Sequence, residues 1–165
     1  MYAGRMTRLA TIDDLNDVYT IYMCKEVIPY LGYDVMPIAE FGPIYAELLD
    51  SNAFYIYELD GKTAGFYRVI YGAGRSKHVA TLSTLAVSPE YHGKGIAKDM
   101  LEGVFADLKK EGITRVELRV ESDNHRGIRF YEKLGFQKEG TLKSRYKRSG
   151  DPDYIDNHIM GMCWH

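Results

Sequence analysis

Along the chain, apolar residues recur either at every second position, as in a strand, or at every third or fourth position, as in a helix. Each change between these two spacings marks a new element. Residues Met6–Ala10 alternate in part, which predicts a short strand. Thr11 is a suitable N-cap with Asp14 in the capping-box position, and apolar residues then recur at helical spacing over Leu15–Met23. This pattern predicts an amphipathic first helix.

Proline and glycine interrupt the pattern over residues 25–37, so we expect a loop there, followed by a second helix over Ala39–Asp50. Two β-rich runs, Ala53–Leu59 and Thr63–Tyr71, are separated by only three residues. The Asp60-Gly61 pair between them is a strong hairpin signal. An antiparallel strand pair is therefore predicted in the middle of the chain.

The second half of the chain continues with alternating helical and strand patterns. We expect a strand over His78–Val87 and then a long helix, with its apolar face from Ile96 to Leu108 and its end at Gly112. A strand over Thr114–Glu121 follows, and then a short helix that is capped by Ser122, Asp123 or Asn124 and ends at Leu134–Gly135. A closing strand pair is expected over Phe136–Leu142 and Tyr154–Met162.

This order of elements predicts an α+β fold in a single domain that covers residues 1–165. Hairpins in the middle and at the end of the chain favour mixed, mostly antiparallel pairing in one central twisted sheet. We expect about seven strands, flanked by about four helices. A chain of this length is able to bury a sizeable core.

Composition and charge narrow the function. The formal net charge of −2 provides no global attraction to nucleic acid, and no run reaches the roughly 18 apolar residues of a membrane span. Met1–Arg5 leave no room for the apolar core of a signal peptide, and Cys24 and Cys163 have neither disulfide-framework nor metal-ligand spacing. We therefore expect a cytoplasmic protein without metal, membrane or nucleic-acid partners. A basic run is interpreted as a solvated hairpin: Lys143, Arg145, Lys147 and Arg148.

The stretch Val87–Ala97 combines the end of a strand, a glycine-spaced turn and the start of a helix. Gly93 and Gly95 permit backbone conformations closed to other residues, and the first helical turn offers unpartnered N–H groups with a partial positive charge. This is a backbone site for a phosphate group. It lacks the Gly-Lys-Ser/Thr of a P-loop and the third glycine and βαβ setting of a Rossmann fingerprint.

Three stretches lie in this order along the chain: Leu85-Ala86-Val87, His92–Ala97, and Asn124 followed by Tyr131 and Gly135-Phe136. Together they resemble the GNAT superfamily of acyl-CoA N-acyltransferases, and the resemblance covers nearly the full chain. His92-Gly93-Lys94-Gly95-Ile96-Ala97 is similar to the family loop Gln/Arg-x-x-Gly-x-Gly/Ala, with His92 as the departure. Leu85-Ala86-Val87 resembles the strand whose main chain pairs with pantetheine. Asn124, followed by Tyr131 and then Gly135-Phe136, matches the third motif. The resemblance implies a GNAT-like fold.

The same resemblance implies direct transfer of an acetyl group from acetyl-CoA to a primary amine. It assigns proton donation to the leaving thiolate to Tyr131, and stabilisation of the thioester oxygen to a backbone N–H near Leu85. Asn124 and Tyr131 lie on one helical face, about 10.5 Å apart along the axis, so they are able to contact different parts of one extended ligand. The implied cofactor-binding residues are Leu85, Ala86, Val87, His92, Gly93, Lys94, Gly95, Ile96, Ala97, Lys98, Asn124 and Tyr131.

The acceptor is less well defined by the sequence. Tyr30, Tyr33 and Asp34 are able to hold a cationic amine through charge and aromatic contact, although a packed surface loop explains them equally well. The end of the chain loosely resembles the small-molecule branch of the superfamily, which favours an amino acid or a polyamine as acceptor. Two alternatives remain: acetylation of a protein N-terminus or lysine, and a non-catalytic acyl-CoA sensor. Dimers are common among relatives, so a homodimer is possible.

No general base is identified by the sequence. Arg119 occupies the position that we align with the base of ribosomal-protein N-terminal acetyltransferases. Glu117 and Glu121 flank it on the same strand face, where alternating charges are typical of a solvated, salt-bridged surface. His78 and His158 are further titratable groups, but an isolated histidine is usually structural.

Overall fold

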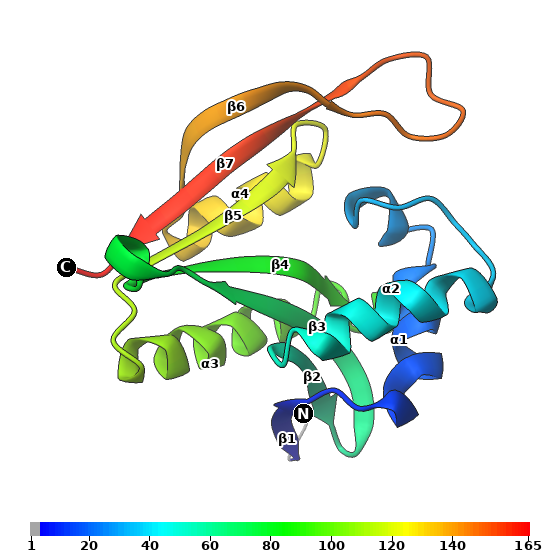
Figure 1. Cartoon of the computed structure of the whole chain (residues 1–165), viewed down its shortest axis with the longest axis horizontal. Helices are drawn as coiled ribbons and strands as arrows, with labels where there is room; N and C mark the ends of the chain where they lie inside the picture. The colour runs from blue at the N-terminus through cyan, green and yellow to red at the C-terminus, as the bar shows by residue number, and fades with distance from the viewer. Residues whose placement is uncertain (1–3) are drawn as a thin grey trace. The chain divides into compact units, whose positions relative to one another are not determined.

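The computed structural model describes residues 4–165, so the expectation drawn from Met1–Ala3 lies outside the described residues. Seven strands form one hydrogen-bonded sheet in the order β1-β2-β3-β4-β5-β7-β6 (Figure 1). β4 pairs with β5 in parallel, whereas β1–β2, β2–β3, β5–β7 and β6–β7 are antiparallel. The predicted mixed sheet is thus confirmed.

The elements follow the predicted order, with short 3₁₀ turns between some of them. The bounds are β1 Arg5–Leu9, α1 Leu15–Tyr22, α2 Ile38–Asp50, β2 Phe54–Leu59, β3 Lys62–Tyr71, β4 Val79–Val87, α3 Ile96–Lys110, β5 Arg115–Glu121, α4 His125–Leu134, β6 Gln137–Tyr146 and β7 Ile155–Cys163.

Two compact units divide the described chain. The first comprises residues 4–69 and Thr84–Gly103, and the second comprises Ile70–Ser83 and residues 104–165. The division runs through β3, β4 and α3. The prediction of a single domain over residues 1–165 stays a prediction.

The core of the first unit is aromatic. Helices α1 and α2 pack against β2 and β3, and Tyr22, Phe41, Phe54 and Phe66 are almost completely buried between them (Figure 1). Their rings lie at tilted or stacked geometries, with centroids 4.9 Å apart for Tyr22 and Phe41 and 5.6 Å apart for Phe54 and Phe66. Such pairs contribute beyond simple area burial. This packing fixes where α1 ends and the following loop begins.

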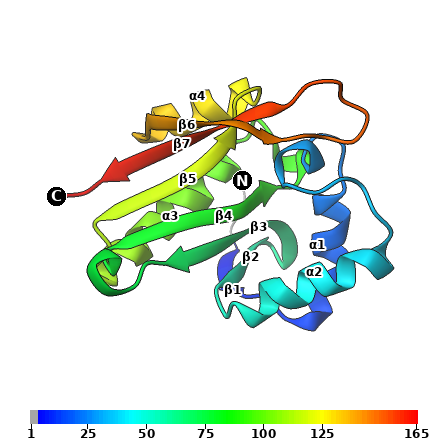
Figure 2. The same ribbon diagram turned by 45° about the horizontal axis from the view of Figure 1, so that its top comes forward.

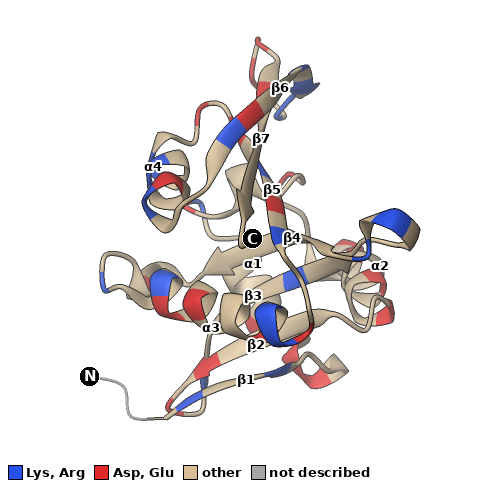
Figure 3. Cartoon of the chain, turned by 90° about the vertical axis from the view of Figure 1, so that its left-hand side faces the viewer, with Lys and Arg blue, Asp and Glu red and all other residues tan. Residues whose placement is uncertain are grey.

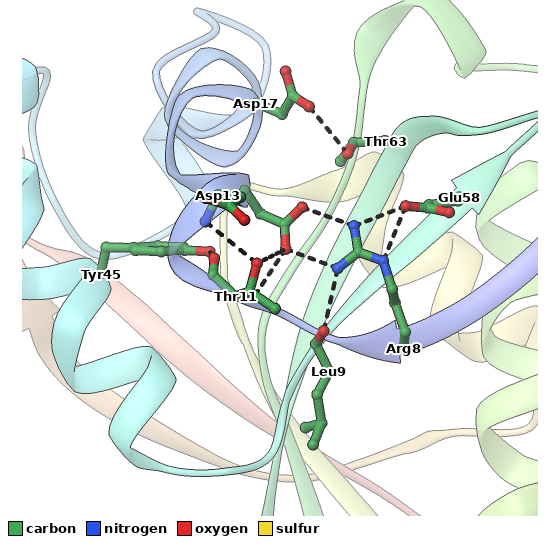
Figure 4. Close-up of polar contacts among 9 residues, drawn as sticks. Arg8, Leu9, Thr11, Asp13, Asp17, Tyr45, Glu58 and Thr63 are labelled. Atoms are coloured by element: carbon green, nitrogen blue, oxygen red, sulfur yellow. Dashed lines mark hydrogen bonds and ion pairs between the residues drawn. The ribbon is translucent and has the colours of Figure 1, made fainter.

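A partly buried ion-pair network joins β1 to the start of α1 in this unit (Figure 4). The Arg8 guanidinium donates to both carboxylate oxygens of Asp14, each at 2.8 Å, and to Glu58 on β2 at 2.7 and 3.0 Å. Asp14 also accepts from the Thr11 N–H at 2.8 Å, which completes the predicted capping box. The network therefore sets the angle at which the chain leaves β1.

The second unit packs the end of α3 and helix α4 against β5 and β7 (Figure 2). Val116, Leu118 and Val120 are buried, and Phe105 on α3 contacts Phe136 and Trp164, with ring centroids 6.0 and 5.5 Å away. The α4 helix ends at Gly135, whose φ of 110° requires glycine. The start of β6 therefore follows directly from this turn.

Two details differ from the sequence expectations. The β6 strand extends to Tyr146, beyond the predicted end, because its pairing with β7 resumes at Tyr146 after an irregular stretch. The basic run is only partly a solvated hairpin. Arg148 is half-buried and forms two hydrogen bonds with the Asp123 carboxylate, and Lys143 pairs with Asp156 at 3.2 Å.

Candidate functional site

The loop between β4 and α3 has the backbone conformation that its sequence predicted. Gly93 and Gly95 have φ values of 74° and 77°, in the left-handed region that favours glycine. A Cβ added at either glycine would meet no atom within 4 Å, so the space next to both residues is open. The glycines are therefore required by conformation, and they leave the main chain accessible.

The main-chain amides of this loop lack partners within residues 4–165. The N–H groups of Gly93–Lys98 donate no hydrogen bond to any described group, and the first bond of α3 is from the Asp99 N–H to the Gly95 carbonyl, at 3.1 Å. Six consecutive free donors at the start of a fifteen-residue helix form a cradle for an anion. We call residues Gly93–Lys98 the amide cradle.

His92 stands where the motif that the sequence resembles has Gln or Arg, and its side chain contacts the preceding strand. Its Nε2 lies 2.8 Å from the Val87 carbonyl oxygen, at the end of β4. The His92 N–H in turn donates to the Pro89 carbonyl at 3.1 Å. The histidine therefore ties the amide cradle to the last residue of the strand that precedes it.

The β4 strand is irregular just before Leu85–Val87. Thr84 has a φ of 48°, which is a strained conformation for a β-branched residue. A positive φ inside a strand turns the adjacent peptide groups away from the regular ladder. Gly65 on β3 approaches this strand closely, because a Cβ there would lie 2.7 Å from the Ala86 carbonyl oxygen. Ala86 and Val87 are buried and Leu85 is half-buried.

In the second unit, Asn124 is the N-cap of α4. Its Oδ1 accepts from the Gly127 N–H at 3.0 Å, which settles the choice among the three predicted caps. A Cβ at Gly127 would lie 2.6 Å from the Asn124 Nδ2, so this cap requires glycine at position 127. The Nδ2 group of Asn124 is left to donate elsewhere.

Tyr131 lies near the end of α4 among other aromatic rings. It contacts Phe130 and Phe136, with centroids 5.4 and 5.8 Å away. Burial, with a smaller contribution from the charge of Glu121, raises the pKa of Tyr131 to about 12. The phenol therefore keeps its proton at neutral pH, as proton donation would require.

The expectation that Glu117 and Glu121 are both solvated is half wrong. Glu117 is salt-bridged to Arg115 at 3.0 Å, as predicted, whereas Glu121 is only 8% exposed. Burial raises the pKa of the Glu121 carboxyl to about 7, against weaker opposing effects that include the charge of Arg148. Sequence reasoning missed this because the alternating charge pattern does not reveal that β7 pairs with the end of β5 and places the buried Asn157 opposite Glu121.

The loop after α1 is fixed by two tyrosine hydroxyls. Tyr19 donates to the Met36 carbonyl at 2.7 Å and Tyr22 donates to the Leu31 carbonyl at 3.1 Å. Between these contacts Tyr33 is 46% exposed, and Asp34 follows it. The three residues proposed for acceptor binding, Tyr30, Tyr33 and Asp34, therefore lie on a loop with fixed ends.

Within residues 4–165, no group of three or more His, Cys, Asp or Glu side chains is arranged to hold a metal ion. None of the helices described is both long enough and apolar enough to span a bilayer.

Comparison with known proteins places the chain in a family. A model of the acetyltransferase (GNAT) family matches residues 15–136. The chain is 28% identical over 144 residues to an uncharacterized N-acetyltransferase of Methanocaldococcus jannaschii. The aligned region covers 82% of this chain and 62% of that protein. It is 36% identical over 72 residues to the [ribosomal protein bS18]-alanine N-acetyltransferase of Escherichia coli, over 44% of this chain and 48% of the relative. The chain thus spans about three fifths of the first relative and about half of the second.

Solved structures share the same fold. The spermidine N-acetyltransferase of Vibrio cholerae in complex with CoA and spermine superposes with a TM-score of 0.80 at 20% identity, covering 97% of this chain and 95% of that one. The strand order, the glycine conformations in the loop after β4 and the family match all point to the same family. The chain belongs to the acetyltransferase (GNAT) family.

Proposed function

We propose that this protein transfers the acetyl group of acetyl-CoA to a primary amine of a small molecule, in one acetyltransferase domain over residues 1–165 and in the cytoplasm. The observation that carries the proposal is the amide cradle: two left-handed glycines and six free N–H groups at the start of α3. An anion is the ligand that such a cradle prefers. Because the family match supports acetyl-CoA as the donor, we take the pyrophosphate of acetyl-CoA to be this anion.

The residues of the cradle fit this ligand. The open space next to Gly93 and Gly95 accommodates phosphate oxygens, and the N–H groups of Ile96–Lys98 face the helix N-terminus. Main-chain groups of Leu85–Val87 and the Asn124 Nδ2 are the proposed contacts to the pantetheine arm. When bound, acetyl-CoA supplies a thioester whose acetyl group an amine accepts.

Tyr131 is the proposed proton donor. Its high pKa keeps a proton on the phenol oxygen throughout the physiological range, so the residue is able to protonate a departing thiolate. The strained backbone at Thr84 supports a second role, because it breaks the regular strand just before Leu85, whose neighbouring main-chain N–H is the proposed donor to the thioester oxygen. Tyr30, Tyr33 and Asp34 remain the proposed contacts to the acceptor.

The test uses a pair of substitutions at Gly95 that differ only in charge. Asp and Asn both tolerate a positive φ, so Gly95→Asp and Gly95→Asn preserve the backbone equally well. We expect Gly95→Asp to weaken acetyl-CoA binding by about 100-fold or more, because like charges then meet in the cradle. Gly95→Asn is expected to retain most of the affinity.

Gly103→Asp is the matched control. It places the same carboxylate on an exposed, open position of the same helix. Calorimetry measures acetyl-CoA affinity, and thiol release with a panel of amines measures turnover. Equal acetyl-CoA affinity in Gly95→Asp and Gly95→Asn contradicts the assignment of the cradle.

A second acceptor class is favoured by one observation, the 36% identity to the E. coli enzyme whose name specifies alanine of a ribosomal protein. Under this candidate, peptides with a free N-terminus are acetylated faster than any small amine. Turnover on such peptides, with none on amino acids or polyamines, would show that the acceptor is a protein N-terminus and not a small molecule. Comparing the free and N-terminally blocked forms of one peptide locates the acetylated group.

A further inference from the structure

The polar face of β5 carries four charged positions. Side chains alternate along a strand, so Arg115, Glu117, Arg119 and Glu121 share one face, and the buried Val116, Leu118 and Val120 occupy the other. Figure 3 shows basic and acidic positions along this strand. All of these residues belong to the second unit. The polar face is therefore a single surface within one compact part of the protein.

The two arginines on this face have different environments. Arg115 pairs with Glu117 at 3.0 Å and with Glu139 on β6 at 2.5 Å, so two carboxylates neutralise its charge. Arg119 is exposed, and within residues 4–165 its guanidinium forms no ion pair or hydrogen bond. Arg119 is thus a cation on β5 that remains available to a ligand.

Glu121, two residues beyond Arg119, lies beside another polar group that lacks a partner. It faces Asn157 across the antiparallel pair of β5 and β7, and directly opposed residues have side chains about 5 Å apart on the same face. Asn157 is only 1% exposed, and its Oδ1 has no hydrogen-bond partner among the described residues. Because an unsatisfied buried polar group is destabilising, the pair is suited to a hydrogen-bond donor from outside the chain.

The spacing of these groups matches a zwitterion. Arg119 and Glu121 are separated by about 6.6 Å along the strand, at about 3.3 Å per residue. A carboxylate on the guanidinium and an ammonium on the Glu121 carboxylate each need a charge-assisted contact of about 2.8 Å. An α-amino acid carries both groups on one carbon, so one molecule is able to bridge the two side chains.

We propose that the polar face of β5 binds the acceptor as a zwitterionic amino acid, with Arg119 holding its carboxylate and Glu121 its ammonium group. Asn157 supports the ammonium side of this site. A polyamine is disfavoured, because its cationic chain meets the unpaired charge of Arg119. The inference rests on the proposed acetyltransferase function and specifies its acceptor class.

The experiment compares each of several α-amino acids with its decarboxylated amine. The wild-type protein is expected to prefer the amino acid in kcat/KM by about 10- to 100-fold, the usual range for a charge-assisted pair. Arg119→Ala is expected to remove this preference by raising KM for the amino acid, while values for the amine change little. Arg119→Lys, which retains the charge without the bidentate geometry, is expected to restore part of the preference.

Lys138→Ala is the control. Lys138 is exposed on β6 and pairs with Met160, whose partner on β5 is Leu118, so it lies on the opposite face of the same sheet. This variant also loses one positive charge, but it should keep the wild-type preference for amino acids. An equal loss of preference in Lys138→Ala and Arg119→Ala means that net charge is responsible, which overturns the proposal.

The remaining outcomes separate this inference from the proposed function. Efficient turnover of polyamines with none of amino acids overturns the zwitterion site but leaves the acetyltransferase function intact. A weaker affinity of Arg119→Ala for acetyl-CoA, with acceptor preference unchanged, assigns the guanidinium to the cofactor and also overturns it. If no amine is acetylated, the proposed function fails. Calorimetric titration of the wild type and Arg119→Ala with the amino acid then tests the inference separately. The inference requires that the wild type binds the amino acid and that Arg119→Ala binds it more weakly, and equal binding by both overturns it.

Discussion

Removal of the Arg8 guanidinium should destabilise the protein far more than removal of any other arginine on β1. In the Arg8→Met variant, Asp14 and Glu58 lose the cation that lies between them (Figure 4). The side chains of these two carboxylates are only 8% and 13% exposed. Asp14 would keep its bond from the Thr11 N–H, but its charge would be left without a counter-ion.

The expected magnitude follows from this burial. Breaking a buried pair by removing one partner typically destabilises a protein by about 3–5 kcal/mol. The Arg8 side chain itself is 33% exposed, so water partly screens the network, and we expect a value near the lower limit, about 3 kcal/mol. With an m-value of about 2 kcal/mol/M in urea, the unfolding midpoint should fall by about 1.5 M.

Arg5→Met is the matched control. Arg5 also lies on β1 and pairs with Asp99 at 3.1 Å, but the two side chains are 48% and 33% exposed. An exposed pair of this kind contributes about 0–1 kcal/mol. Urea unfolding followed by far-ultraviolet circular dichroism compares both variants with the wild type, because the signal reports on both units.

The dependence on pH provides the refuting result. Hydrogen bonds from Arg8 hold the pKa of Asp14 below its usual value, so this stabilisation is present above about pH 4 and is lost as the pH falls through the folded-state pKa. The difference between wild type and Arg8→Met should therefore shrink below pH 4. A midpoint shift no larger than that of Arg5→Met, or one independent of pH between 3 and 7, refutes the reasoning.

Three further predictions concern the candidate site and its support. Burial raises the pKa of Glu121 to about 7, so the wild type should lose stability relative to Glu121→Gln as the pH rises from about 4.5 to 7. The loss should be about 1.4 kcal/mol per unit of difference between the folded and unfolded pKa of Glu121. Thermal melts of both proteins across this pH range measure it. Tyr131→Phe should lower kcat by about 100-fold with a much smaller change in acetyl-CoA affinity. A measurable but unaltered kcat would exclude Tyr131 as the proton donor, whereas acetyl-CoA binding without any turnover in the wild type would favour the non-catalytic sensor. Gly65→Ala should destabilise the protein and weaken acetyl-CoA binding, since its Cβ would lie 2.7 Å from the Ala86 carbonyl oxygen. In contrast, Gly103→Ala, in an open position of α3, should stabilise the protein by about 0.5–1 kcal/mol.

Local patterns were sufficient to predict the elements and the backbone conformation of the loop that we propose as a phosphate site. The capping box of Thr11 and Asp14, the hairpin at Asp60-Gly61 and the glycines at positions 93 and 95 depend on residues that are close in sequence. Each acts through its own backbone conformation or through a neighbour within one turn. The order of these elements predicted the mixed sheet for the same reason.

Long-range contacts decided the properties of individual side chains. The strand pattern of β5 gives Glu117 and Glu121 the same character, and only the antiparallel pairing with β7 shows that Glu121 faces the buried Asn157. Likewise, the sequence shows an atypical His92, but only the fold brings its Nε2 to the Val87 carbonyl. Periodicity reports which face of an element is apolar, whereas the burial, charge and pKa of a side chain depend on the element packed against that face. For this protein, the sequence by itself predicted the loop proposed to bind the acetyl donor and a first set of acceptor contacts, because both depend on residues close together in the chain. The tertiary structure added Arg119 and Glu121 to the residues that we propose for the acceptor, because the burial of Glu121 depends on strands that are distant in the sequence.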